Sequence, residues 1–208
     1  MEKMLADKIH WLGHDAFRID AESIIYFDPF KIQGGPEADI ILISHDHHDH
    51  CSPEDIAKIQ GKETVIIAGA SSLKKLSGRV SAMAPGDSLT VKGITIQAVP
   101  AYNINKKFHP RENGGLGFVV EIDGVRIYHA GDTDLIPEMK EIRADIVLLP
   151  VSGTYVMTAA EAAEAALTLN PALAIPMHYG TLVGEAADAE RFSRLLEGKI
   201  RVRIPVKE

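Results

Sequence analysis

Short apolar runs separated by turn residues dominate the first half of the chain. Four of them predict strands, because β-branched residues bounded by turn residues favour extended backbone; they span residues 23–28, 39–44, 64–69 and 94–99. Between the second and third runs, Ser52 is followed by Pro53, Glu54 and Asp55. A hydroxyl cap, a first-turn proline and acids near the positive end of the helix dipole predict a short helix ending near Ile59.

The second half alternates strand and helix patterns. Residues 116–132 alternate around Asp123-Gly124, a dipeptide that suits a tight hairpin turn. Strands are predicted at 145–151, 173–177 and 200–205, with helices from Thr158, where Glu161 completes a capping box, and over 185–196. Strands accompanied by helices in both halves predict an α/β fold, a four-layer αββα sandwich. Because no linker divides the chain, we expect one domain over residues 1–208.

Composition excludes several classes of protein. The 208 residues are 46% hydrophobic and 25% charged, as in soluble globular proteins, and no apolar run approaches the roughly 18 residues of a membrane span. The N-terminus does not resemble a secretion signal, and Cys51 is the single cysteine, so we expect a cytoplasmic protein. With 22 Lys and Arg against 29 Asp and Glu, the charge of −7 gives no reason to expect general nucleic-acid binding. The sequence does not indicate an oligomeric state.

A cluster of four histidines and two aspartates occupies residues 45–50, directly after a predicted strand. In extended backbone, residues two apart point to the same side, so His45 and His47 can bind one metal ion. Asp49 and His50 precede the capped helix, where the chain must turn, and they suit a second ion. Histidine-rich tracts can also be tags or metal scavengers, but those lie at termini or in disordered segments.

The pattern His-x-His-x-Asp-His resembles the signature of the metallo-β-lactamase fold superfamily, whose members are αββα sandwiches with one or two metals at the edge of the sheets. The resemblance extends to "HAGDTD" at residues 129–134 and "IPMHYG" at 175–180. It implies that Asp132 bridges both metals and that His178 completes the second site. It also implies that Asp28 orients a ligand histidine.

One position departs from the superfamily pattern. Asn103 stands where members usually carry another histidine before the central hairpin. Either its amide oxygen or His109 from the following loop could complete the first site. We prefer His109, because neutral imidazole binds zinc-like ions better than an amide. With neither, His45, His47, Asp132 and a bridging hydroxide still give four donors, the usual number for zinc.

The opening residues 10–20 resemble the Trp-x-Gly-His start of a small branch that includes L-ascorbate-6-phosphate lactonase. That likeness places His14 near the metals, either for substrate contact or proton transfer or, equally, as a hydrogen-bonded histidine in a turn. In the loop after Asn103, the cations Lys106, Lys107 and Arg111 are either solvated charges or a site for a phosphate or carboxylate.

The predicted chemistry is hydrolysis. Two close divalent ions, zinc with manganese or iron as alternatives, lower the pKa of a shared water from about 15.7 towards neutrality. We expect a hydrolase in which a metal-bridging hydroxide attacks an ester, lactone, amide or phosphodiester of a small metabolite, including phosphorylated or anionic ones. Asp49, Asp132 and His14 are the candidate catalytic residues. One alternative is a metal-binding sensor or accessory protein with little turnover, because Asn103 stands where a ligand histidine is usual. Another is an iron-dependent redox enzyme.

Overall fold

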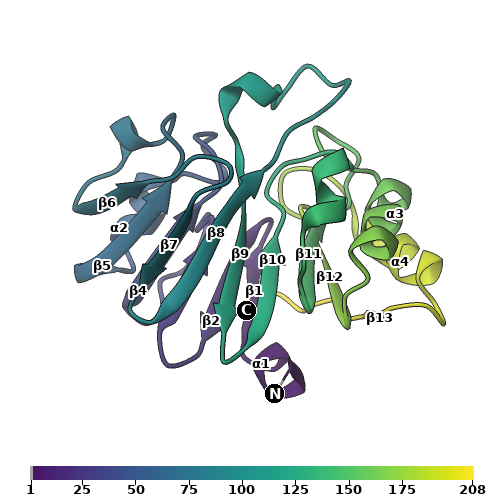
Figure 1. The fold of residues 1–208 in the computed structure, drawn as a ribbon, viewed down its shortest axis with the longest axis horizontal. Helices are drawn as coiled ribbons and strands as arrows, with labels where there is room; N and C mark the ends of the chain where they lie inside the picture. Colours follow the sequence, from purple (N-terminus) through teal and green to yellow (C-terminus); the bar gives the residue numbers. More distant parts are fainter. Residues whose placement is uncertain (1) are drawn as a thin grey trace.

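Two β-sheets face each other in the computed structural model, which describes residues 2–208 and the side chains of residues 3–208. The first sheet has the strand order β1-β2-β3-β4-β5-β6 and the second the order β13-β12-β11-β10-β9-β8-β7 (Figure 1). The strands of the first sheet are β1 Ile9–Gly13, β2 Ala16–Asp20, β3 Ile24–Phe27, β4 Ala38–Ile43, β5 Gln60–Ala68 and β6 Arg79–Ala82. Those of the second are β7 Ser88–Val91, β8 Ile94–Pro100, β9 Leu116–Ile122, β10 Val125–His129, β11 Ile146–Pro150, β12 Leu173–Met177 and β13 Arg201–Val202. The helices are α1 Glu2–Ala6, α2 Pro53–Ala57, α3 Ala159–Leu169 and α4 Ala186–Leu195, with 3-10 turns η1 Leu73–Lys75, η2 Arg111–Asn113 and η3 Pro137–Glu141.

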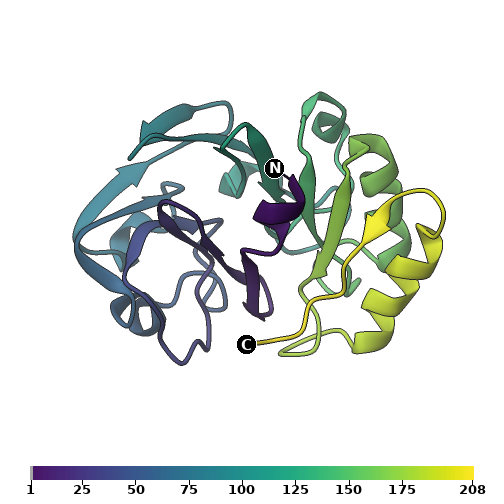
Figure 2. The ribbon, with the colours of Figure 1, turned by 90° about the horizontal axis from the view of Figure 1, so that it is seen from below.

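The layers follow from the alternation of side chains along buried strands. On β4, Ile40 and Leu42 face the core between the sheets, whereas Ile41 and Ile43 pack in an outer cluster with Ile56 of α2. Helices α3 and α4 cover the outer side of the second sheet, as Figure 2 shows for the green and yellow half. The four-layer αββα sandwich is therefore confirmed.

Local signals predicted several elements correctly. Ser52 caps α2 by accepting a hydrogen bond from the Asp55 amide at 3.3 Å, and Thr158 and Glu161 form the predicted capping box of α3. The hairpin turn between β9 and β10 has positive φ at both Asp123 and Gly124, which is the geometry that a two-residue turn of this kind requires.

Four strands were not predicted, namely β1, β2, β6 and β7. The short strands β6 and β7 have no fully buried residue and contain few large apolar residues, so their sequence pattern is weak. The last strand, β13, covers only Arg201–Val202 instead of the predicted 200–205. Pro205 has no amide hydrogen to continue a ladder, which is consistent with this early end.

Strand direction places the polar loops together. Strands β3, β4, β5 and β6 run parallel in the first sheet, and β10, β11, β12 and β13 run parallel in the second. The carboxyl ends of these strands lie at one edge of the sandwich, at the top in Figure 1. Within residues 2–208, no helix has both the length and the apolar character that crossing a membrane requires.

Candidate metal centre

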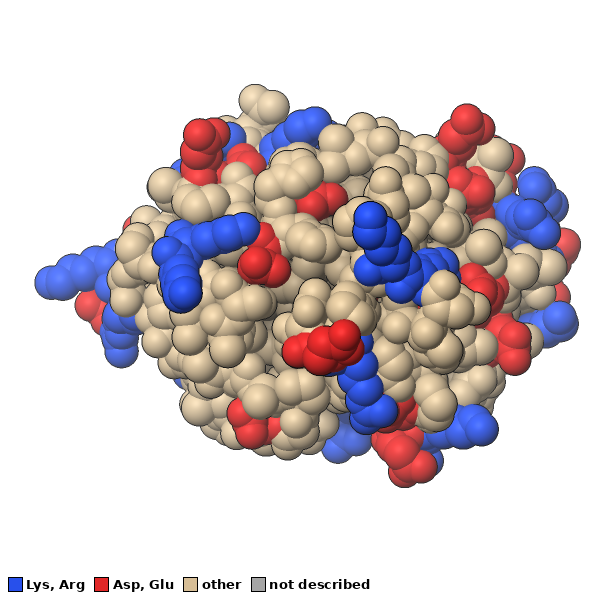
Figure 3. All heavy atoms as spheres, turned by 90° about the horizontal axis from the view of Figure 1, so that it is seen from above, with Lys and Arg blue, Asp and Glu red and all other residues tan. Residues whose placement is uncertain are grey.

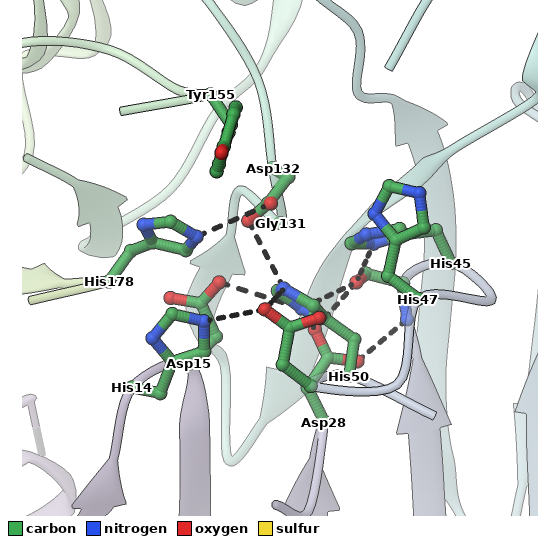
Figure 4. Close-up of polar contacts among 12 residues, drawn as sticks. His14, Asp15, Asp28, His45, His47, His50, Gly131, Asp132, Tyr155 and His178 are labelled. Carbon is green, nitrogen blue, oxygen red and sulfur yellow. Dashed lines mark hydrogen bonds and ion pairs between the residues drawn. The ribbon is translucent and has the colours of Figure 1, made fainter. Parts of the chain in front are cut away.

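Polar side chains from widely separated loops meet at this edge of the sandwich (Figure 4). His14 follows β1, residues 45–50 follow β4, Asp132 follows β10 and His178 follows β12. Among the side chains of residues 3–208, three groups have ligand atoms that all lie within 4.8 Å of one another: His45, His47 and His109; His14, Asp49, His50 and His178; and Asp15, His50, Asp132 and His178. The sequence predicted all of these residues except Asp15 as members of the site.

The first group contains three histidines. His109 Nε2 lies 2.9 Å from His47 Nδ1, and the His45 ring centroid is 4.8 Å from that of His109. His109 belongs to the long loop between β8 and β9 and was the preferred of two candidates for this position. The structure brings it together with the two histidines that follow β4.

Asn103 lies beside this group and holds His109 in place. Its amide nitrogen donates to the carbonyl oxygens of Phe108, at 2.9 Å, and Tyr155, at 2.6 Å. Its backbone amide donates to the carbonyl of His109 at 2.7 Å. His109 Nδ1 lies 3.2 Å from the same Tyr155 oxygen, so donation there directs the Nε2 lone pair towards His47. Asn103 thus ties together the two loops that flank His109, a role that sequence reasoning missed.

Asp132 lies between the group of His45, His47 and His109 and the histidines His50 and His178. Its Oδ2 is 3.4 Å from His109 Nε2 and 3.3 Å from His178 Nε2. Its Oδ1 is 3.4 Å from His50 Nε2. One carboxylate therefore faces histidines of both groups, which is the arrangement that a bridging ligand needs.

Polar side chains behind the histidines fix how the rings are oriented. Asp28 Oδ2 lies 2.8 Å from His50 Nδ1, and Asp28 Oδ1 accepts the Ser44 amide at 2.7 Å. Ser152 Oγ lies 2.9 Å from His178 Nδ1. In both cases the Nε2 atom is left to face Asp132. The contact of Asp28 with a histidine agrees with the role that the resemblance implied, whereas Ser152 had no sequence signal that identified it.

His14 does not fit the expected role in substrate contact. Its side chain is fully buried, and its Nε2 lies 3.2 Å from Asp49 Oδ2. Its ring packs 4.2 Å from the ring of His178, measured between centroids. Because it has no exposed surface, its geometry does not support direct substrate contact, whereas proton transfer and the alternative of a hydrogen-bonded histidine in a turn both stay predictions.

Burial and neighbouring charges set the protonation of the cluster. Burial, together with the charge of His50, lowers the pKa of His45 well below its usual value. For His178 burial acts in the same direction, but the Asp132 and Asp15 carboxylates outweigh it and raise the pKa to about 9. Burial raises the pKa of Asp132, but the charges of His178 and His50 outweigh it and lower that pKa well below normal. Without cations, the carboxylates therefore draw protons onto histidines.

The residues present fit divalent cations. The buried atoms His45 Nε2, His50 Nε2 and Asp132 Oδ1 have no hydrogen-bond partner among residues 2–208. Neither oxygen of Asp15, a fully buried carboxylate, has one there either. Buried polar atoms are normally paired, and buried charges are normally paired or coordinate metals, so these orphaned atoms are typical of a metal site. The mixed nitrogen and oxygen donors suit zinc, manganese or iron.

The cluster forms the floor of an open cleft of about 290 Å³. The cleft is lined by His47, His48, Asp49, Phe108, His109, Asp132, Tyr155, His178, Leu182 and Val183. Cys51, the single cysteine, is 2% exposed and packs in the outer cluster with α2. His129 is buried and lies 2.9 Å from the Asp15 carbonyl oxygen through Nε2, so it is outside the cleft.

Comparison with known proteins identifies the family. The family described as the beta-lactamase superfamily domain matches residues 8–178. A UPF0173 metal-dependent hydrolase of Thermococcus onnurineus is 36% identical over 214 residues, which cover 95% of each chain. A UPF0173 metal-dependent hydrolase of Methanoculleus marisnigri is 35% identical and covers 95% of this chain and 92% of its own.

Two solved structures with a similar fold are also described as metal-dependent hydrolases. A crystal structure from Parabacteroides distasonis, described as a metal-dependent hydrolase, has a TM-score of 0.86 and 36% identity, covering 96% of this chain and 93% of its own. One from Thermotoga maritima, described as a Zn-dependent hydrolase of the metallo-β-lactamase superfamily, has a TM-score of 0.68 and 26% identity, covering 96% and 98%. The predicted resemblance is confirmed, and the chain belongs to the metallo-β-lactamase superfamily, among the UPF0173 metal-dependent hydrolases.

Proposed function

We propose that this protein uses two divalent ions, with zinc as the first candidate, to hydrolyse an ester, lactone or phosphodiester bond of a small molecule. One observation supports this most directly: at the floor of a cleft that is open to solvent, the Asp132 carboxylate lies 3.3 to 3.4 Å from His50, His109 and His178, which belong to different ligand groups. The relatives of this chain are named metal-dependent hydrolases, and their names give no bond type or substrate. One domain over residues 1–208 and a cytoplasmic location remain part of the proposal.

Each ion has a proposed set of ligands. His45, His47 and His109 hold the first, and Asp49, His50 and His178 hold the second. Asp132 bridges them, in keeping with its distances of 3.3 to 3.4 Å from histidines of both groups. Divalent ions so held lower the pKa of a shared water from about 15.7 towards neutrality and polarise the bond to be cleaved.

The protein's own side chains orient the proposed ligands and the water in the cleft. Asp28 and Ser152 fix the rings of His50 and His178 through their Nδ1 atoms, which keeps both Nε2 atoms pointed at Asp132. Asp49 lines the cleft with 18% of its side chain exposed. It is therefore placed to orient water or to hand a proton to the leaving group, as the catalytic assignment requires.

Metal analysis combined with turnover tests the proposal. Protein purified without added metal should contain about two divalent ions per chain, and it should hydrolyse members of a panel of carboxylate esters, lactones and phosphodiesters. His47→Ala and Asp132→Ala should abolish both turnover and stoichiometric metal binding. His10→Ala is the matched control, because His10 belongs to none of the three ligand groups and does not line the cleft.

Two outcomes oppose the proposal. Full metal occupancy with no turnover on any class of ester would favour a binding or sensing protein. Iron as the bound metal, with oxygen-dependent rather than hydrolytic chemistry, would favour a redox enzyme.

A further inference from the structure

We propose that the substrate is an uncharged carboxylic ester or lactone whose acyl group is apolar, and that the entrance of the cleft binds this group. The inference rests on the proposed hydrolytic function and specifies its substrate class. It is carried by the side chains around the entrance and by the position of the loop cations.

Three large apolar side chains surround the entrance while remaining exposed. Phe108 is 41%, Leu182 43% and Tyr155 46% exposed, and all three line the cleft. The Phe108 and Tyr155 rings meet edge to face, with centroids 4.7 Å apart. Val183 adds a fourth apolar side chain to the lining. Exposed apolar side chains gathered in one place, unlike single scattered ones, mark a surface that binds an apolar group.

These side chains come from three different loops of the second sheet. Phe108 lies between β8 and β9, Tyr155 between β11 and α3, and Leu182 between β12 and α4. Asn103 binds the carbonyl oxygens of both Phe108 and Tyr155, so the aromatic part of the entrance is joined to the loop that carries His109. Figure 4 shows Tyr155 on the side of the cluster where Asp132 and His178 lie. An acyl chain packed at the entrance would thus lie directly beside the reacting bond.

The loop cations are turned to other partners. Lys106 forms an ion pair with Asp134. Arg111 lies 2.9 Å from Glu138 and packs over the ring of Tyr102. Lys107 is exposed and is not part of the lining. The reading in which these cations bind a phosphate or carboxylate is therefore not supported by the geometry.

The described lining of the cleft also contains no side chain with a permanent positive charge that could pair with an anionic group. Among the described residues, none of those that line it is lysine or arginine, whereas Asp49 and Asp132 are carboxylates. Figure 3 views the molecule from above the orientation of Figure 1, and it shows acidic and basic side chains interspersed on that face rather than gathered by sign. A charged acyl terminus would lose its hydration at the apolar entrance without gaining a partner, which is unfavourable.

The test uses p-nitrophenyl esters of one leaving group and different acyl groups, with the metal-loaded protein. From acetate to pentanoate, kcat/KM should rise about fourfold for each methylene that the entrance buries, up to about 60-fold over three methylenes. The rise should appear mainly in KM. Mono-p-nitrophenyl glutarate has the same chain length as the pentanoate but ends in a carboxylate, and it should react at least about tenfold more slowly.

Variants locate the effect. Phe108→Ala and Leu182→Ala should flatten the dependence on chain length, and Leu182→Lys should raise the rate on the glutarate relative to the pentanoate. Ile204→Ala is the control, since Ile204 is also 41% exposed but lies outside the cleft. It should leave the chain-length series unchanged.

Binding of non-hydrolysable alkyl hydroxamates separates this inference from the function on which it rests. If no ester is hydrolysed but pentanohydroxamate binds more tightly than acetohydroxamate in calorimetry, the apolar site stands and the hydrolase proposal fails. If esters are hydrolysed with a flat series or a preference for the glutarate, the inference is overturned and the hydrolase stands. Absence of chain-length dependence in both turnover and binding overturns the inference as well.

Discussion

Replacing Asn103 by alanine tests whether this residue holds His109 in the cluster. The substitution removes a donor that reaches the carbonyl oxygens of Phe108 at 2.9 Å and Tyr155 at 2.6 Å, at a site that is only 5% exposed. The backbone hydrogen bond from residue 103 to the His109 carbonyl does not depend on the side chain. The loop is therefore expected to loosen rather than to detach.

The magnitude follows from the two lost hydrogen bonds. Each contributes about 1 kcal/mol net, so the free energy of unfolding should fall by about 2 kcal/mol. The Tyr155 carbonyl also orients His109 through Nδ1. Loss of a group that orients a ligand typically lowers metal affinity about 10–100-fold, and here the loss should concern one ion of two.

Two assays separate these effects. Urea unfolding in EDTA measures the stability of the metal-free protein, and zinc titration against a competing chelator measures the affinity of each ion. Asn105→Ala is the matched control, because Asn105 is an exposed asparagine in the same loop. Stability within about 0.5 kcal/mol of wild type, together with two unchanged zinc affinities, would refute the reasoning.

Three further predictions concern the rest of the site. Asp28→Asn removes the carboxylate behind His50 and should lower the affinity for one ion about 10–100-fold, measured by the same zinc titration. Gly131→Ala should destabilise the protein by well over 1 kcal/mol in urea unfolding, because φ is +62° and a Cβ would lie 2.7 Å from a backbone oxygen; Gly124→Ala, with a φ of +75° and open space, should cost only about 1 kcal/mol. In the metal-free protein the pKa of His178 is raised to about 9, so its contribution to stability is present below about pH 6.5 and lost as the pH rises through about 9; unfolding in EDTA that shows no such decline would contradict this.

The sequence by itself determined the frame of the fold. Buried strands such as β4 consist of runs of β-branched and other apolar residues, which can be recognised in the sequence. Helix caps such as Ser52 and Thr158 bind the unpaired amides of the first helical turn, so they too can be recognised from neighbouring residues. The cluster from His45 to His50 is likewise local. By contrast, the short strands β6 and β7 were missed because their stability comes from pairing with neighbours rather than from a pattern of their own.

Only the tertiary structure decided how the site is completed. Whether Asn103 or His109 joins His45 depends on hydrogen bonds to Tyr155, which is about fifty residues away and carries no motif. Asp15 is a fully buried acidic side chain that faces His50, and neither of its oxygens has a hydrogen-bond partner among residues 2–208. The apolar entrance likewise exists because three loops of the second sheet converge. Sequence patterns report contacts between near neighbours in the chain. The side chains of this centre come from segments that are far apart in the sequence, and only the packing of the two sheets brings them within hydrogen-bonding distance of one another.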